Sequence, residues 1–72
     1  MAEFNYQITE KIAVLSQNGN LTKEFNKVSF NGAEPKFDIR AWKRADGEEK
    51  MFKGVTLTED ELQALKTALE TL

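Results

Sequence analysis

The chain has 72 residues and a net charge of −2, and it contains neither cysteine nor histidine. A chain of this length forms one small domain, so we expect residues 1–72 to fold as a single unit around a small core. The missing side chains exclude disulfides, a thiolate nucleophile, an imidazole base and the usual transition-metal ligands. Oligomerisation remains as a means of adding stability, and we expect a homodimer without metal or cofactor.

The amino terminus shows no targeting signal. Residues 1–5 lack the basic start and the apolar run of a signal peptide. No apolar stretch of the chain reaches the ~20 residues of a membrane span. We therefore expect a cytoplasmic protein with no membrane partner.

Residues 4–16 predict a long β-strand that bends near residues 9–11. The apolar residues of this strand keep one parity: Phe4, Tyr6, Ile8, Ile12 and Val14. Asn18 and Gly19 follow, and this pair is typical of a tight turn that requires positive φ angles. The chain is therefore expected to reverse there.

A second strand is predicted over residues 22–30, although its pattern is imperfect. Val28 and Phe30 share one parity, whereas Phe25 falls on the other. Either a bulge intervenes, or the regular strand begins after Phe25. Residues 31–35 then form a loop, because they hold a second Asn-Gly pair and end on a proline.

The third predicted strand, residues 36–43, organises the rest of the chain. Alternation places Phe37, Ile39 and Ala41 on one face, which we expect to be the core. The opposite face carries Lys36, Asp38, Arg40 and Trp42. Two cations and a large ring on one sheet surface favour contact with a nucleic-acid strand.

The remainder of the chain predicts a loop, a strand and a helix. Residues 45–49 have the composition of a hairpin loop, and residues 50–57 form a fourth strand in which Gly54 marks a bulge or a close backbone approach. Thr58-Glu59-Asp60-Glu61 is a capping box, and Leu57 and Leu62 are placed for a hydrophobic staple. Leucines at helical spacing follow, so the helix is expected to run to the carboxyl end and cover the sheet. The fold class is therefore α+β, a four-stranded antiparallel meander followed by one helix.

The chain does not predict an enzyme or a small-molecule substrate. Ser16 and Ser29 have no recognisable activating partner, and the four glycines are scattered singly, so no phosphate-binding loop is formed.

Nucleic-acid binding is the better supported interpretation. Residues 21–53 hold eight of the ten cations against six acids, which gives this segment a positive field despite the acidic total. The candidate binding residues are Phe30, Lys36, Arg40, Trp42, Lys43, Lys50 and Lys53. Flat rings accept any base by stacking while cations follow the phosphates, and this combination favours single strands.

Each candidate also has a structural interpretation. Trp42 either stacks on bases or packs in the core, as most tryptophans of small domains do. Phe30 is open to the same two interpretations. Arg40 can pair with Asp38 on the strand surface, and Lys50 and Lys53 can keep an edge strand soluble.

The chain resembles a known family over residues 12–66. The run from Lys36 to Trp42, the short acidic loop, and residues 50–58 leading into an acidic helix start resemble the positive cofactor four family of transcriptional coactivators. The similarity is greatest to its short bacterial YdbC-type branch, and its most specific parts are Asp38-Ile39-Arg40 and Lys53-Gly54.

This resemblance implies a homodimer of curved four-stranded sheets, each with a carboxyl-terminal helix, that binds single-stranded DNA with little sequence preference. The family positions that contact DNA match Arg40 and Lys53, with Phe30, Lys36 and Trp42 close by. The implied roles are transcription regulation, with the transcription machinery as a further partner, or accessory work in replication and repair. The alternative from another class is a small dimeric protein-interaction module.

Overall fold

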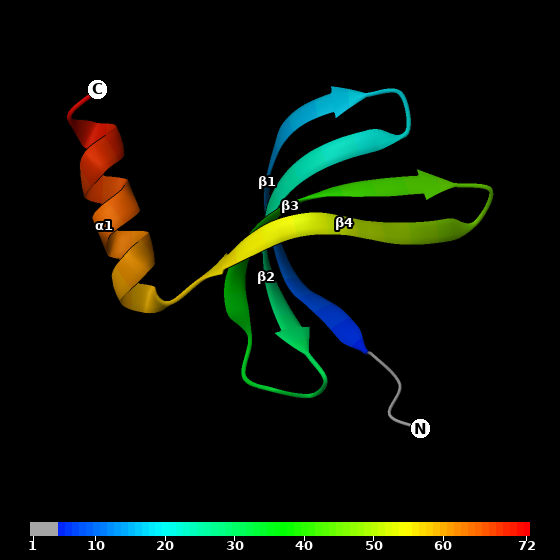
Figure 1. Cartoon of the computed structure of the whole chain (residues 1–72), viewed down its shortest axis with the longest axis horizontal. Helices are drawn as coiled ribbons and strands as arrows, with labels where there is room; N and C mark the ends of the chain where they lie inside the picture. The colour runs from blue at the N-terminus through cyan, green and yellow to red at the C-terminus, as the bar shows by residue number, and fades with distance from the viewer. Residues whose placement is uncertain (1–4) are drawn as a thin grey trace.

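The computed structural model describes residues 5–72 as one four-stranded antiparallel sheet followed by one helix (Figure 1). The elements are β1 (Tyr6–Asn18), β2 (Leu21–Phe30), β3 (Lys36–Ala45), β4 (Glu48–Leu57) and α1 (Glu59–Glu70). The strands lie side by side in chain order, so the predicted meander and its closing helix are confirmed. Phe4, which was predicted to begin the first strand, lies outside the described residues.

The turn between β3 and β4 is shorter than the sequence predicted. Asp46 and Gly47 alone form it, both with positive φ angles of 54° and 75°, and Ala45 pairs directly with Glu48. Positive φ at both central residues matches the twist of the two strands, so they can be joined by two residues. The expected loop at residues 45–49 is therefore mostly strand.

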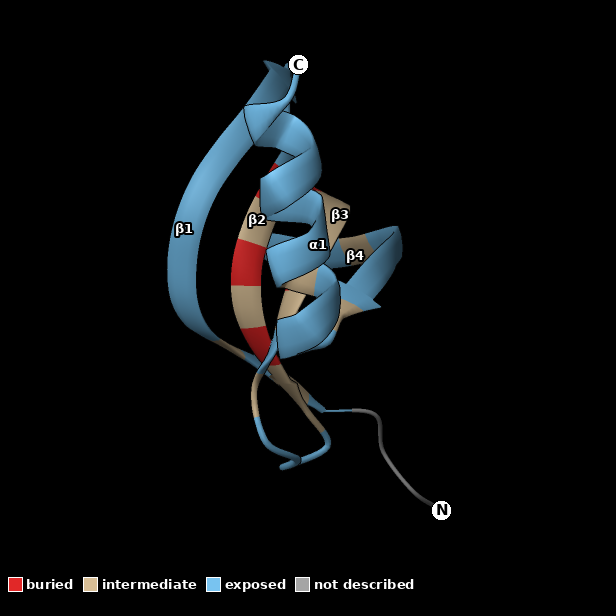
Figure 2. Ribbon diagram, turned by 90° about the vertical axis from the view of Figure 1, so that its left-hand side faces the viewer, coloured by how far each residue is buried: buried red, intermediate tan, exposed pale blue. Residues whose placement is uncertain are grey.

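β1 bends more often than predicted. Its pairing with β2 shifts register three times, first between Ile8 and Glu10 and twice more before Ser16. The first shift confirms the bend expected near residues 9–11. The three shifts together overturn the expectation of a single parity, because each extra residue moves the following side chains to the other face. Figure 2 shows β1 bowing away along the edge of the sheet.

β2 pairs with β3 without any shift between Leu21 and Val28. Both explanations offered for Phe25, a bulge in the second strand or a regular strand that begins after Phe25, are therefore wrong. Its ring lies on the face opposite Val28 and contacts the ring of Phe37, with 5.9 Å between the ring centroids. The sheet thus carries apolar residues on both of its faces.

The core lies on the opposite face from the expected one. The buried residues are Val28, Trp42, Glu24, Asn26 and Asp38, and all of them lie on the face around which the sheet curves, which we call the inner face. Figure 2 shows several of these buried positions in β2. Phe37, Ile39 and Ala41 lie on the outer face and are only half-buried. Because the sheet curves, side chains of the inner face bury one another, whereas the single helix is too small to bury the outer face.

α1 begins as predicted but does not cover the sheet. The hydroxyl of Thr58 accepts a hydrogen bond from the amide of Glu61 at 3.2 Å, and the Glu61 carboxylate accepts one from the amide of Thr58 at 2.8 Å. No residue of α1 is buried. Within residues 5–72, no helix has the length and apolar character needed to cross a membrane.

A groove of about 570 Å³ separates α1 from the outer face of the sheet. Its lining residues are Leu15, Phe25, Ile39, Leu62, Leu65, Lys66, Leu69 and Glu70. The helix stands beside the sheet at the end of β4 (Figure 1). The expectation that α1 covers the sheet is therefore wrong for the isolated chain, because the helical leucines face a groove.

Candidate nucleic-acid interface

A bulge in β4 places two consecutive side chains on the outer face. The Cα partners on either side of it are Arg40 with Gly54 and Trp42 with Met51. Ala41 therefore stands opposite both Phe52 and Lys53. Since Met51 and Gly54 belong to the inner face, alternation from each of them turns Phe52 and Lys53 outward.

Gly54 makes this bulge possible. A Cβ atom at this position would lie 2.5 Å from the backbone oxygen of Ile39 and would also collide with the side chain of Arg40. Only glycine lets β3 and β4 approach so closely. The predicted irregularity at Gly54 is confirmed.

Four lysines surround the bulge on the outer face, and we call them the lysine patch: Lys23, Lys43, Lys50 and Lys53. Lys43 pairs directly with Lys50 across β3 and β4, and Lys23 stands opposite Ala41. All four are exposed. Among the ion pairs formed within residues 5–72, none involves a lysine of the patch.

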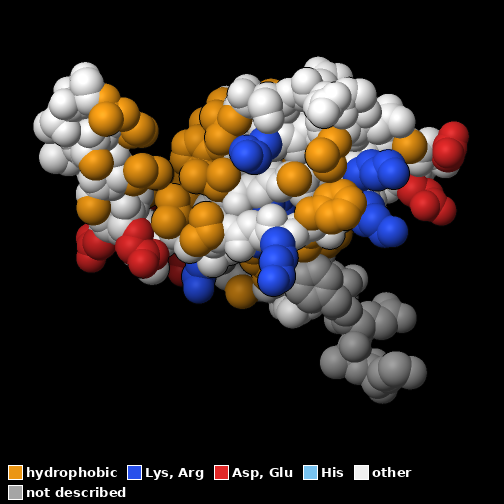
Figure 3. All heavy atoms as spheres, turned by 45° about the horizontal axis from the view of Figure 1, so that its top comes forward, with side chains coloured by type: hydrophobic (Ala, Val, Ile, Leu, Met, Phe, Trp, Pro, Cys, Tyr) orange, Lys and Arg blue, Asp and Glu red, His pale blue; other side chains and the backbone are white. Residues whose placement is uncertain are grey.

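The lysine patch is an unfavourable arrangement for the fold alone. Like charges directly opposite each other on neighbouring strands destabilise a sheet, and no carboxylate of residues 5–72 forms an ion pair with Lys43 or Lys50. Figure 3 shows Lys and Arg side chains around exposed apolar groups on the sheet, with acidic side chains toward the ends of the molecule. A polyanion is the ligand that this surface would attract.

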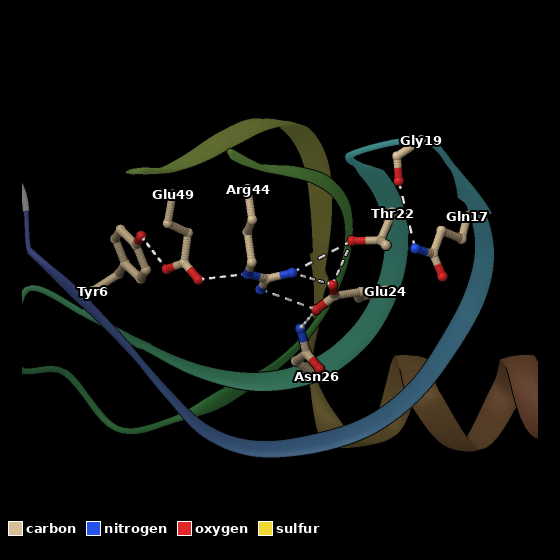
Figure 4. A network of polar contacts seen from close by, with 8 residues as sticks. All are labelled: Tyr6, Gln17, Gly19, Thr22, Glu24, Asn26, Arg44 and Glu49. Atoms are coloured by element: carbon tan, nitrogen blue, oxygen red, sulfur yellow. Dashed lines mark hydrogen bonds and ion pairs between the residues drawn. The ribbon is translucent and has the colours of Figure 1, made fainter. Parts of the chain in front are cut away.

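The inner face carries charges of a different kind, in a closed network (Figure 4). The Arg44 guanidinium donates to Glu24 at 2.5 Å and to Glu49 at 2.7 Å. Glu24 also accepts hydrogen bonds from Thr22 and Asn26, and Glu49 accepts one from the hydroxyl of Tyr6 at 2.6 Å.

These contacts shift the pKa values of the network. Burial alone would raise the pKa of Glu24, but the hydrogen bonds from Arg44, Thr22 and Asn26 outweigh it and hold that pKa at about 2. The hydrogen bond from Tyr6, followed by that from Arg44, lowers the pKa of Glu49. Glu24, Glu49 and Arg44 are thus all charged at neutral pH, and their charges are satisfied within the network.

Arg40 is committed to the inner face as well. Its guanidinium donates two hydrogen bonds to the buried carboxylate of Asp38, at 2.7 and 2.6 Å, and one to the backbone oxygen of Phe52 at 3.3 Å. It also lies 5.2 Å from the ring centroid of Phe30. Its side chain is 13% exposed, which leaves little of the cation for a ligand.

Trp42 is completely buried, with 0% of its surface exposed. Its ring packs at 5.4 Å from the ring of Tyr6, and the Arg44 guanidinium lies 5.4 Å from its centroid. A base has no access to the faces of this ring. The packing alternative for Trp42 therefore describes this structure.

The structure divides the seven predicted residues between the two faces. Lys43, Lys50 and Lys53 lie together in the lysine patch on the outer face. On the inner face lie Phe30, Lys36, Arg40 and Trp42, of which Lys36 alone is exposed. The expected convergence on one surface is wrong, because it assigned the outer face to the core.

Two residues of the outer surface were not predicted: Lys23 and Phe52. Phe52 is a large aromatic residue that is 42% exposed. Its position between Lys50 and Lys53 was a usable signal, but regular alternation does not place all three on one face. Only the bulge does so, and its register is not visible in the sequence.

Known proteins are similar to this chain over most of its length. The model of the family described as Transcriptional Coactivator p15 (PC4) matches residues 18–68. The chain belongs to the PC4 family. An uncharacterized protein of Treponema pallidum (strain Nichols) is 41% identical over 71 residues, which cover 97% of this chain and 81% of that protein. The PC4 family binds nucleic acid and is not a family of enzymes, so membership supports DNA binding at the level of the family.

Proposed function

We propose that this protein binds single-stranded DNA with little sequence preference, through the outer face of its sheet. The observation that carries the proposal is the lysine patch, four exposed cations without acidic partners among residues 5–72. Lysines arranged in this way follow a phosphate backbone without reading bases. Such a protein would act where single strands are exposed, in transcription, replication or repair.

The helix argues against recognition of duplex DNA. Reading the major groove requires an α-helix or a two-stranded ribbon whose side chains reach the base edges. The first turn of α1 carries three acids, Glu59, Asp60 and Glu61, and its last turn carries no basic residue. This end of the helix would repel phosphates, so the sheet is the better surface.

Among the other predicted contacts, we retain Lys36 as a peripheral cation and assign Arg40 and Trp42 to the scaffold. Lys36 is exposed at the start of β3. Arg40 and Trp42 are held by Asp38, Phe30 and Tyr6 rather than presented to solvent. Their contribution to binding is then indirect, through the shape of the sheet.

The test is fluorescence anisotropy with a labelled thymidine oligomer of about 20 nucleotides, the same sequence as a duplex, and several salt concentrations. We expect preference for the single strand and a log-log salt slope of about −0.7 per phosphate neutralised. Replacing Lys43 or Lys50 with Gln should make the slope shallower by about 0.7 each. The matched control is Lys11→Gln, an exposed lysine of β1 outside the patch.

Two results would overturn the proposal. The first is absence of binding at low salt. The second is an equal effect of Lys11→Gln and Lys43→Gln on the salt slope, since binding would then follow total charge and not the lysine patch.

We further propose that a second copy of the chain covers the groove beside α1. Leu65, Leu69 and Leu72 are 36%, 57% and 98% exposed, and contiguous apolar surface of this kind marks a protein interface. A domain of this size also has too small a core to leave its leucines in water without cost. Light scattering after size exclusion should give the dimer mass, and Leu69→Asp should give the monomer. Thr67→Asp, on another face of the same helix, is the control and should leave the dimer intact.

The same groove supports the alternative function, a protein-interaction module. That function predicts that substitutions in the lysine patch leave partner binding intact while Leu69→Asp abolishes it. Absence of DNA binding by a folded, dimeric wild-type protein would favour this alternative.

A further inference from the structure

We propose that Phe52 stacks on a base of the bound strand, and that Arg40 is a positioning residue that holds the bulge presenting Phe52. The inference rests on the proposed single-strand binding and names the residues that would give that site its contact with bases. It differs from what the family resemblance implies, in which Arg40 itself grips the DNA.

Phe52 is the aromatic side chain that a base can reach. It is 42% exposed, whereas every other aromatic residue between residues 5 and 72 is half-buried or buried. It lies on the outer face between Lys50 and Lys53 in sequence. An aromatic ring among cations is the arrangement that holds a single strand, because every base has a flat face to stack.

The bulge supplies what a regular strand cannot. Consecutive residues of a regular strand point to opposite faces, so Phe52 and Lys53 would be separated by the sheet. With both opposite Ala41, they project on the same face. One step of the backbone thereby provides a stacking surface and a phosphate contact next to each other.

Arg40 holds this bulge from the inner face. Its Nη1 donates to the backbone oxygen of Phe52 at 3.3 Å. Its Nε and Nη2 are fixed by the fully buried carboxylate of Asp38. The two-pronged contact makes the guanidinium rigid, and a rigid donor can fix the bulge carbonyl in place. Lysine cannot reproduce this geometry.

The experiment compares two oligomers of equal length, about 20 thymidines and the corresponding chain of abasic sugar-phosphates. Wild-type protein should prefer the thymidine oligomer. Phe52→Ala should lose about 10-fold in affinity for thymidine and almost nothing for the abasic chain. Phe52→Tyr should keep the preference. Lys43→Gln should lower the affinity for both oligomers by the same factor. The control is Leu21→Ala, because Leu21 is an exposed apolar residue next to the lysine patch but has no aromatic ring. This variant should keep the preference for the thymidine oligomer.

The positioning role is tested with Arg40→Lys. Loss of the Phe52 contact should reduce the thymidine preference as Phe52→Ala does, with the salt slope unchanged. Adding Phe52→Ala to Arg40→Lys should cause little further loss, because both act on one contact. Far-ultraviolet circular dichroism and the emission of buried Trp42 verify folding, and the Phe52 variants decide the stacking role if Arg40→Lys does not fold.

The outcomes separate the two proposals. An unchanged ratio of affinities for the two oligomers in Phe52→Ala would overturn the stacking role of Phe52. Retained preference in Arg40→Lys, with a shallower slope in Arg40→Gln, would show that Arg40 contacts phosphate instead. Failure of the wild-type protein to bind either oligomer would overturn single-strand binding itself.

Discussion

The two faces of the sheet use charge in opposite ways. On the inner face, Arg44 and Arg40 are tied to carboxylates at 2.5 to 2.7 Å, and the acids Glu24 and Asp38 are buried. On the outer face, the lysine patch is exposed and has no acidic partner within residues 5–72. Both of these arginines have a structural role that the fold explains, whereas Lys36, at the start of β3, is exposed.

The outer face has no such explanation within one chain. Residues that depart from what the fold prefers, without an evident structural gain, point to function. The Lys43–Lys50 pair and the exposed ring of Phe52 are departures of this kind. The difference between the faces therefore supports the proposed site more directly than the distribution of basic residues along the chain does.

The largest expected loss of stability comes from a substitution on the inner face. Trp42→Ala should cost about 3 to 5 kcal/mol of unfolding free energy, which is close to the whole stability of so small a domain. Phe52→Ala, on the outer face, should cost less than about 1 kcal/mol, since its ring is already 42% exposed. Urea unfolding followed by circular dichroism, at fixed protein concentration, measures both.

A milder substitution tests the packing of the same ring. Trp42→Phe removes an indole N–H that has no hydrogen-bond partner among the described residues, so part of the lost packing is offset. A Trp42→Ala protein as stable as wild type would show that this ring is not core.

The next effect is the loss of stability in acid through the inner network. The pKa of Glu24 falls from 4.5 to about 2 on folding, so its ionised form stabilises the fold fully above pH 4.5. That contribution is lost as the pH falls from 4.5 to 2, and it is on the order of 3 kcal/mol. At pH 7, Glu24→Gln should have a lower free energy of unfolding than wild type. This difference between the two proteins should shrink as the pH falls from 4.5 to 2. An equal difference at pH 7 and pH 2.5 would contradict the assignment.

A smaller loss of stability is expected from Gly54→Ala, at the bulge where β3 and β4 approach each other closely. An added methyl group would collide with the backbone of Ile39 and the side chain of Arg40, which should cost about 1 to 3 kcal/mol. Gly32→Ala is a control of another kind, since its methyl would meet nothing within 4 Å and its cost comes from a φ of +75° alone. Thermal unfolding of both variants separates the two causes. If Gly54→Ala costs nothing, the close approach of β3 and β4 is not required.

The sequence predicted the order of elements because their signals are local. The capping box at Thr58, the turns at Asn31-Gly32 and Asp46-Gly47 and the glycine of the bulge each act within a few residues, and each is found where expected. The first turn lies one residue later than predicted, because Asn18 still pairs with Leu21 and the turn is formed by Gly19 and Asn20. Curvature of the sheet is not local. It depends on three register shifts in β1 and decides which face is buried, so the core was assigned to the wrong side of β3.

For the candidate site, too, local features were predicted from the sequence and non-local features were not. Lys43, Lys50 and Lys53 were proposed as binding residues from charge and position, and the structure brings them together on one face. Arg40 and Trp42 were expected to be exposed, because a strand pattern with polar residues on one face is normally exposed there, but Trp42 is buried and Arg40 is only 13% exposed. Here a buried network of ion pairs fills that face, and its partners, such as Glu24 and Glu49, come from other strands.

The smallest effect on stability should accompany a large effect on binding. Lys43→Glu turns the like-charge pair with Lys50 into an attractive one and should stabilise the fold by about 0.2 to 1 kcal/mol, while it places a negative charge in the path of the phosphates. Lys43→Glu combined with Lys50→Glu restores a like-charge pair, so stability should return to about the wild-type value while binding is lost altogether. Urea unfolding and oligomer anisotropy measured on the same samples separate the two readouts. If Lys43→Glu weakens folding and binding together, the lysine patch belongs to the scaffold and the distinction between the faces fails.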